Sequence, residues 1–212
     1  MKKLVLSLVA VAAFGYVANA QEKETFGFEK GNIILEGSIS INDSKVTNEK
    51  TGIETKFTDY NFNPKAGYFL NDKFAVGLEL GFGKEGYTYG TTNIDHKNTT
   101  YVGAFARYYF LELGKRFKTY GEFGLGYQGS KAEVSNHSIK TNGVKAAVSV
   151  GMNYFITDKF AIGVGLGDIL AVTNGNSKYN GTKTSSDSTV KANINVFNNF
   201  FDQPTFSLTY KF

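Results

Sequence analysis

The sequence contains two histidines, and the residues beside each could support acid–base or nucleophilic chemistry. His96 follows Asp95, a carboxylate that could orient an imidazole acting as a general base. His137 lies between Asn136 and Ser138, and the serine could act as a nucleophile. The corresponding activity would be hydrolysis or acyl transfer. Both groups lie in polar segments that we expect to be loops, where neighbours in sequence do not make a catalytic constellation, so we predict that the protein is not an enzyme.

Other kinds of chemical site have little support in the sequence. There is no cysteine, and the two histidines are far apart, so no cluster of metal ligands is indicated. The glycine-rich run GLGYQG at residues 124–129 has strand spacing and is followed by no helix, unlike a phosphate-binding loop. The charges are nearly balanced, with 23 basic and 19 acidic residues. We therefore expect no cofactor, no metal ion and no nucleic-acid partner.

Six charged residues stand within segments that otherwise alternate between large apolar side chains and small or polar ones. Three are acidic and three are basic, and the alternation places all six on the face of the small side chains. A charge removed from water requires an oppositely charged partner. We predict that the six form a charged belt across the interior of the fold: Glu36, Lys65, Glu79, Arg107, Glu122 and Lys145.

The alternation that positions these charges has a period of two residues, which is the period of a β-strand. From residue 74 to residue 83 every even position is large and apolar, whereas the odd positions are Ala75, Glu79 and glycines. A soluble barrel would fill its centre with bulky side chains, but a centre lined by glycine and alanine could not pack. The bulky residues must therefore face outward, toward lipid. An outward arginine or lysine at the membrane midplane would cost about 2 to 4 kcal/mol, which favours inward charges.

An internal repeat sets the order of the strands. The segment YFLNDKFAVGLELG at residues 68–81 recurs as YFITDKFAIGVGLG at residues 154–167, and each copy reads as strand, tight turn, strand. A third hairpin surrounds Gly114. Longer polar stretches separate these short turns, at residues 43–55, 90–98, 130–142 and 173–189. This asymmetry predicts an eight-stranded antiparallel up-and-down transmembrane β-barrel with short periplasmic turns and long extracellular loops.

The eighth strand is the least regular of the predicted set. Three hairpins supply six strands, residues 32–42 supply the first, and the C-terminal segment supplies the last. Residues 190–196 share even parity with residues 206–212, so we predict one long strand interrupted by a bulge at Pro204. The stretch VFNNFFDQP at residues 196–204 fits either a folded-in loop or an upper strand.

The N-terminal segment MKKLVLSLVAVAAFGYVANA has two lysines, an apolar core and small residues at Ala18 and Ala20. These are the features of a secretory signal peptide, and we predict cleavage after Ala20. The apolar core is shorter than the roughly 20 residues that span a bilayer. The predicted organisation is a signal peptide over residues 1–20, a lead-in over residues 21–31 and a barrel over residues 32–212.

Together these elements make a chain that resembles the small outer-membrane β-barrels of the OmpX and OmpA-barrel type. It is particularly similar to such barrels from Bacteroidota, in which hairpins like GYFLNDKFA and strands like RYYF recur. The resemblance implies the outer membrane of a Gram-negative bacterium, with outer-membrane lipids and lipopolysaccharide as surroundings, and a monomer. It also implies that the barrel-assembly machinery reads the last strand through its alternating apolar residues: Phe206, Leu208, Tyr210 and Phe212.

The function expected from this architecture is that of a non-porin membrane protein with a structural or surface-interaction role in the cell envelope. An eight-stranded barrel has an interior just wide enough for side chains, and the charged belt would occlude it. The inward glycines leave some room, so a narrow solute channel is the alternative. The third hypothesis is an outer-membrane lipid-modifying enzyme that uses the loop histidines. No surface partner is indicated by any motif.

Overall fold

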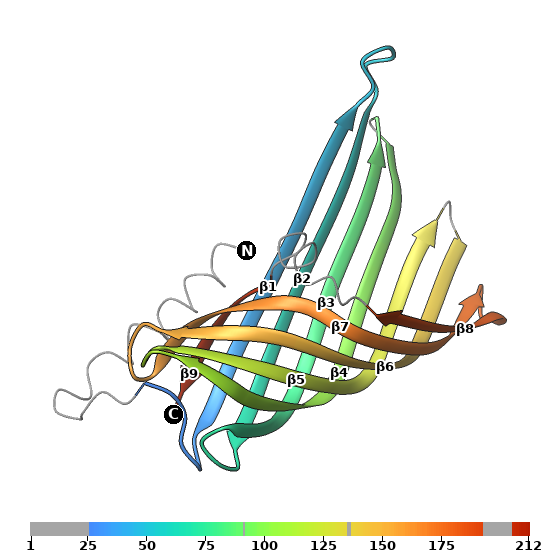
Figure 1. Cartoon of the computed structure of the whole chain (residues 1–212). Helices are drawn as coiled ribbons and strands as arrows, with labels where there is room; N and C mark the ends of the chain where they lie inside the picture. Colours follow the sequence, from blue (N-terminus) through green and yellow to red (C-terminus); the bar gives the residue numbers. More distant parts are fainter. Residues whose placement is uncertain (1–25, 91, 135–136, 193–204) are drawn as a thin grey trace.

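The computed structural model describes residues 26–90, 92–134, 137–192 and 205–212. These residues form antiparallel strands joined by turns (Figure 1). Among them, no helix is long and apolar enough to cross a membrane. The strands are β1 (Ile33–Thr47), β2 (Glu54–Phe69), β3 (Phe74–Tyr89), β4 (Thr92–Leu113), β5 (Phe117–Val134), β6 (His137–Phe155), β7 (Phe160–Tyr179), β8 (Thr182–Ala192) and β9 (Thr205–Lys211).

The strands close into a ring of eight positions, which confirms the predicted up-and-down barrel. Each strand from β1 to β7 pairs with the next one in sequence, and β9 pairs with β1 on one edge and β7 on the other. Two strands share the eighth position. β9 pairs with the lower part of β7, residues 160–165, whereas β8 pairs with its upper part, residues 170–179. The predicted bulge at Pro204 and the stretch 196–204 lie outside the described residues.

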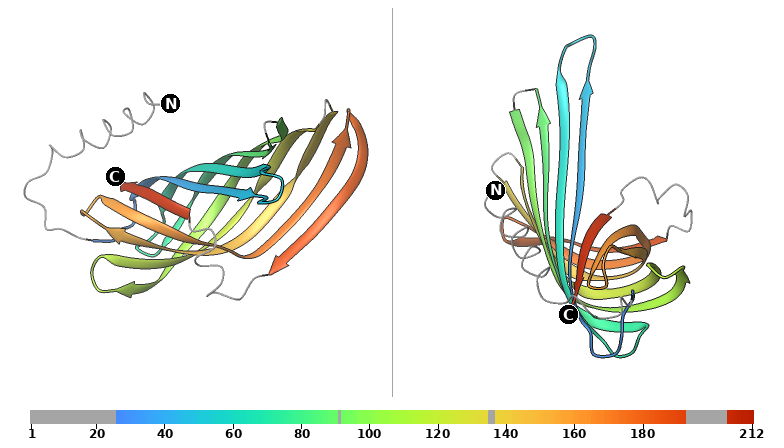
Figure 2. Two further views of the ribbon diagram at one scale, coloured as in Figure 1. Left: turned by 90° about the horizontal axis from the view of Figure 1, so that it is seen from above. Right: turned by 90° about the vertical axis from the view of Figure 1, so that its left-hand side faces the viewer.

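The long connections on the extracellular side continue as strand for most of their length. The β7–β8 hairpin turns at Asn180 and Gly181, whose φ angles of 46° and 89° suit the tight turn that an Asn-Gly pair favours. Strand therefore runs through most of the polar segment 173–189. Threonine and serine, which are frequent there, pair well across strands even where no apolar face is buried. The β1–β2 and β3–β4 hairpins rise away from the inclined β7–β8 hairpin (Figures 1 and 2).

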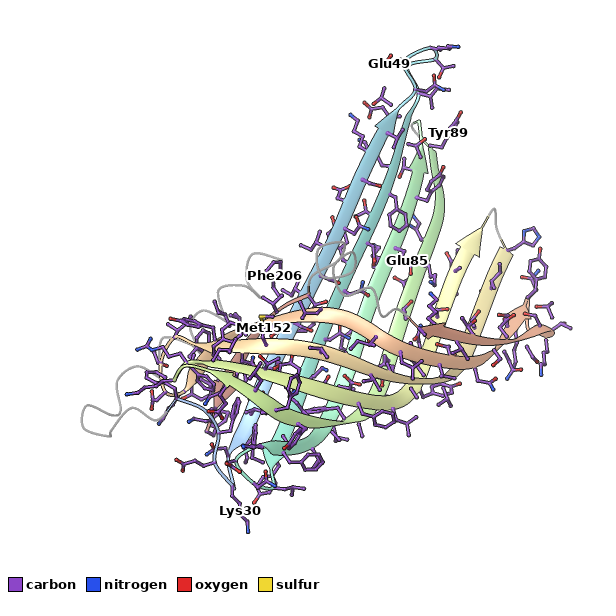
Figure 3. All side chains as sticks on the ribbon, in the orientation of Figure 1. Lys30, Glu49, Glu85, Tyr89, Met152 and Phe206 are labelled. Carbon is purple, nitrogen blue, oxygen red and sulfur yellow. The ribbon has the colours of Figure 1, made fainter. Side chains whose placement is uncertain are left out.

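The two faces of the wall follow the predicted parity. On β3, Leu78 is 68% exposed on the outside, while Ala75 is completely buried inside. The last strand behaves in the same way, because Phe206, Leu208 and Phe212 are exposed and Tyr210 is half-buried, while Ser207, Thr209 and Lys211 between them are buried. Glu49 at the tip of the β1–β2 hairpin and Lys30 before β1 mark opposite ends of the molecule (Figure 3). The outer wall is therefore apolar, and polar groups gather within and at the ends.

Candidate functional site: the filled interior of the barrel

Arg107 on β4 is the centre of a buried charge cluster. Its Nη1 and Nη2 atoms each donate a 2.8 Å hydrogen bond to one carboxylate oxygen of Glu36 on β1. Its Nε donates a 2.6 Å hydrogen bond to Glu122, the residue directly opposite on β5. Only 1% of Arg107 is exposed. Because the bidentate pair joins strands that are not neighbours, it crosses the interior of the barrel.

Lys65 on β2 completes the cluster. Its Nζ lies 3.0 Å from a carboxylate oxygen of Glu79 and also contacts Glu122. The strand register explains the contact with Glu79, which is the direct partner of Lys65 on β3, whereas Glu122 on β5 is reached across the interior. The cluster thus consists of three carboxylates and two cations.

Lys145 was predicted as the third cation of this group, but the structure pairs it elsewhere. Its Nζ lies 2.7 Å from Asp168 on β7. By simple alternation Asp168 would share the lipid face with Ile162 and Val164. A register shift and Gly167, with a φ of 85°, turn it inward instead. The sequence does contain an indication of this ion pair. A carboxylate on the lipid face at this depth is unfavourable, so the charge of Asp168 indicates a bulge that turns the residue inward.

A chain of hydrogen bonds through three neutral side chains links the cluster to two further strands, β6 and β9. Arg107 Nη1 donates to the hydroxyl of Tyr109 at 3.3 Å, and that hydroxyl donates to Asn153 Oδ1 at 3.0 Å. Asn153 Nδ2 donates to Thr209 Oγ1 at 3.4 Å, and Thr209 donates to Glu36 at 2.9 Å. We call this chain of hydrogen bonds the hydrogen-bond circuit. It runs from β4 through β6 and β9 to β1, and so links the last strand to the first. Sequence reasoning did not single out Tyr109, Asn153 or Thr209, although each has inward parity.

An aromatic layer closes the barrel below the charges. Phe28, from the segment before β1, stacks on Phe69 with ring centroids 4.2 Å apart and meets Phe155 edge-on at 5.1 Å. The ring of Tyr109 lies 4.8 Å from that of Phe28, so it joins this layer to the hydrogen-bond circuit above. From the sequence alone, residues 21–31 are expected only as a lead-in to the barrel. The two phenylalanines of FGFEK, residues 26–30, are the sequence feature that indicates a role in the barrel interior.

Polar contacts hold the segment before β1 in the periplasmic mouth. Lys211 Nζ donates a 2.8 Å hydrogen bond to the carbonyl oxygen of Gly27. The guanidinium carbon of Arg116 lies 4.2 Å from the centroid of the Phe26 ring. Gly27 has a φ of 126°, and a Cβ atom there would come within 3.1 Å of Lys118 Cε. A glycine is therefore needed for the chain to turn inward at this point.

A polar cavity of about 420 Å³ lies on the extracellular side of the charge cluster. Lys65, Glu79 and Glu122 contribute to its lining, together with the Lys145–Asp168 pair. The rest of the lining includes serine, asparagine and glutamine side chains, glycines, and the side chains of Tyr101 and Tyr120. We call this cavity the vestibule.

Several of the inward glycines are covered by aromatic rings. A Cβ atom on Gly103 would lie 2.4 Å from the Tyr101 hydroxyl, and one on Gly126 would lie 2.5 Å from Tyr101 Cζ. A Cβ atom on Gly151 would lie 2.4 Å from the Tyr120 hydroxyl. The glycines thus make room for rings that lie against the inner wall, and less of the interior is open than the glycine count suggests.

The two histidines are not brought together. His96 lies on β4 and His137 on β6, with β5 between them. His137 stacks on Tyr179, with ring centroids 5.2 Å apart. The side chains of Asp95 and Asn136 lie outside the described residues. No group of three or more potential metal ligands occurs within the part of the chain that the structure describes.

Comparison with known proteins agrees with this architecture. A family model described as "Outer membrane protein beta-barrel domain" matches residues 6–200. The structure is similar to that of OprG from Pseudomonas aeruginosa, with 16% identity, a TM-score of 0.52, and coverage of 88% of this chain and 98% of that chain. It also resembles Escherichia coli outer membrane protein W (19% identity, TM-score 0.45, covering 87% and 99%) and Neisserial surface protein A (16%, 0.46, covering 86% and 98%). No curated protein matches the chain.

Proposed function

The chain belongs to the outer membrane protein β-barrel family and lies in the bacterial outer membrane, and we propose that it acts there as a closed, non-porin barrel with a structural and surface-interaction role. The observation that carries this proposal is the filling of the interior at two successive levels. The charge cluster around Arg107 occupies the middle of the barrel, and the aromatic layer around Phe28 occupies its periplasmic mouth.

The charge cluster is a barrier because its members satisfy one another. A hydrated ion passing this level would have to separate Arg107 from Glu36 or Lys65 from Glu79. Removing one partner of a buried ion pair costs about 3 to 5 kcal/mol, since the other charge is left uncompensated. Thermal separation of these pairs is therefore rare, and the middle of the barrel stays closed.

The aromatic layer is a second, independent barrier. Phe28 is buried against Phe69 and Phe155, and the buried apolar cluster continues with Ile34 and Tyr109. Such a layer contains few groups that could replace the water molecules around an ion. Both levels would have to open together for a continuous aqueous path.

The surface-interaction role rests on the four polar hairpins beyond the barrel wall. The β1–β2 hairpin projects furthest with the β3–β4 hairpin, and its tip carries exposed polar residues around Glu49 (Figures 1 and 3). Strand pairing keeps these extensions in one shape, so they present a rigid polar surface outside the cell. No catalytic role is proposed for His96 or His137, because β5 separates them.

The proposal also includes the processing and assembly of the chain. Residues 1–20 would be removed as a signal peptide after Ala20, and the barrel domain would begin near residue 32. The barrel-assembly machinery would recognise the outward residues of β9, and the product would be a monomer. The mass of the mature protein extracted from outer membranes tests the cleavage site directly.

Single-channel recording in planar bilayers tests the closed-barrel proposal. The protein is refolded in detergent, and its folded fraction is checked by heat-modifiable migration on gels before it is added to the bilayer. We expect no stable openings from the wild-type protein. Long, large ion-conducting openings from a fully folded sample would contradict the proposal.

The vestibule supports a second candidate, a narrow solute channel. Its volume of about 420 Å³ is enough for a small polar solute. The cluster beneath it has three carboxylates and two cations, so any conduction would favour cations. Reversal potentials measured across a salt gradient separate this candidate from the closed barrel, which carries no current.

A further inference from the structure

Three lysines form a row across the outside of three adjacent strands. Lys131 on β5 is the direct partner of Lys140 on β6, and Lys140 is the direct partner of Lys178 on β7. Directly opposed residues of antiparallel strands point to the same face of the sheet. We call these three residues the lysine row. Beyond a bulge, the register continues to Lys183 on β8.

The lysine row lies on the lipid-facing side, just above the apolar band. Lys131 is four residues from Tyr127 on β5, and Lys140 is four residues from Val144 on β6. An even separation places both residues of each pair on the same face of the strand. Tyr127 and Val144 are themselves direct partners and are 51% and 49% exposed on the outer wall. Four residues of strand span about 13 Å, or about 10 Å of height at the usual tilt. The flexible lysine side chains can bend toward the membrane, which places their ammonium groups at the depth of the lipid headgroups.

The positive charge of the row is not balanced by the protein. Lys131 Nζ lies 2.6 Å from Glu133, but no ion pair involving Lys140 or Lys178 occurs among the described residues. Asp187 on β8 lies opposite Gly175, on the inward parity of β7, and its carboxylate contacts Ser177. Like charges directly opposite each other destabilise a sheet. The row therefore calls for an anion from outside the chain.

The same arrangement occurs elsewhere in the barrel, and there the chain supplies its own anion. Lys45 and Lys56 are direct partners on β1 and β2. Glu54 lies 2.5 Å from the Nζ of Lys45 and 3.5 Å from that of Lys56, so both lysines of this pair have a carboxylate partner within the chain. The contrast makes the Lys45–Lys56 pair a matched reference for Lys140 and Lys178.

We propose that the lysine row binds the phosphate groups of an acylated, phosphate-bearing glycolipid of the outer leaflet. The ammonium groups would contact the phosphates, while Tyr127 and Val144 below them would contact the acyl chains. A lipid is preferred to free phosphate because the apolar wall begins about 10 Å beneath the row, so one molecule with a phosphate and acyl chains can contact both. This inference rests on the proposed orientation, in which the polar hairpins lie outside the cell.

Binding of bisphosphorylated lipid A to the protein in uncharged detergent micelles tests this inference. The variant K140Q/K178Q removes two charges from the row, and the control K45Q/K56Q removes two charges from the reference pair. We expect the row variant to bind about tenfold or more weakly, because a lysine near an anionic membrane surface contributes about 1 kcal/mol. The control variant should stay within about twofold of the wild-type protein. Equal binding by the row variant, or an equal loss in the control, would overturn the proposal.

Two further arms identify the source of the phosphate and need only the wild-type protein. Dephosphorylated lipid A should bind about tenfold or more weakly than the bisphosphorylated form, and millimolar inorganic phosphate should not displace the glycolipid. Equal binding of the dephosphorylated form, or displacement by inorganic phosphate alone, would overturn the assignment to a lipid phosphate. Conductance is a separate readout: a protein that conducts ions and still binds lipid A through the row would refute the closed barrel without refuting this site.

Discussion

The guanidinium group of Arg107 and the carboxylate of Glu36, 71 positions apart in sequence, form a bidentate pair across the barrel, with both hydrogen bonds 2.8 Å long. β1 and β4 are not neighbours in the sheet, so the pair bridges the interior instead of following the wall. Thr209 on β9 donates to the same carboxylate. The first, fourth and last strands are therefore fastened at one point, at the level where the barrel is closed.

We expect Arg107→Met to lower the free energy of unfolding by about 3 to 5 kcal/mol, because it leaves Glu36 without its ion-pair partner and leaves Lys65 as the one cation of the cluster beside three carboxylates. Urea titration of the protein in micelles, followed by heat-modifiable migration, measures this loss. Adding Glu36→Gln to the variant should restore part of it, since one of the stranded charges is removed. The control Lys131→Gln, at an exposed ion pair, should change stability by less than about 1 kcal/mol. A fully stable Arg107→Met protein would show that the cluster does not hold the strands together.

Phe28→Ala should release the segment before β1 from the periplasmic mouth, because the mutation removes the ring that stacks on Phe69. The expected result is rapid proteolytic cleavage around residues 26–31 while the barrel keeps its heat-modifiable migration. Limited proteolysis with mass spectrometry measures the change. Lys30→Ala, at an exposed position of the same segment, is the control and should be cleaved no faster than the wild-type protein. Equal resistance of Phe28→Ala would mean that other contacts hold the segment.

Conduction should require the removal of both barriers. We expect Arg107→Ser and Phe28→Ser to remain closed as single variants, because each leaves the other level intact. The double variant should conduct and should prefer cations, since Glu36, Glu79 and Glu122 then outnumber Lys65. Planar-bilayer recordings with a salt gradient measure both properties. If Arg107→Ser alone conducts as well as the double variant, the aromatic layer is not a barrier.

Gly151→Ala should destabilise the barrel by about 1 to 3 kcal/mol, because the new methyl group would overlap the Tyr120 ring, whose hydroxyl lies 2.4 Å from the ideal Cβ position. Gly121→Ala, directly opposite Val150 on the neighbouring strand, is the control, since nothing lies within 4 Å of its Cβ position. A double-mutant cycle of Gly151→Ala with Tyr120→Leu isolates the clash. Additive effects in that cycle would place the strain elsewhere.

The faces of the strands could be predicted from the sequence with little error. Leu78 points to lipid and Glu79 inward because successive side chains of a strand alternate, which is a property of the local backbone. The exception, Asp168, shows the limit of that reasoning. A bulge with Gly167 at positive φ interrupts the alternation at Asp168, and Leu170 and Val172 face outward again beyond it; a bulge of this kind depends on the pairing with β6.

What the sequence determined by itself was the pattern: an eight-position barrel, an apolar outer wall, and charges turned inward, all of which follow from a period of two residues. The tertiary structure decided which inward groups meet. Arg107 reaches Glu36, Lys145 pairs with Asp168, and Phe28 closes the mouth because ring closure and register bring distant strands together. Those contacts depend on the stagger of all the strands at once, and no short stretch of sequence encodes that stagger.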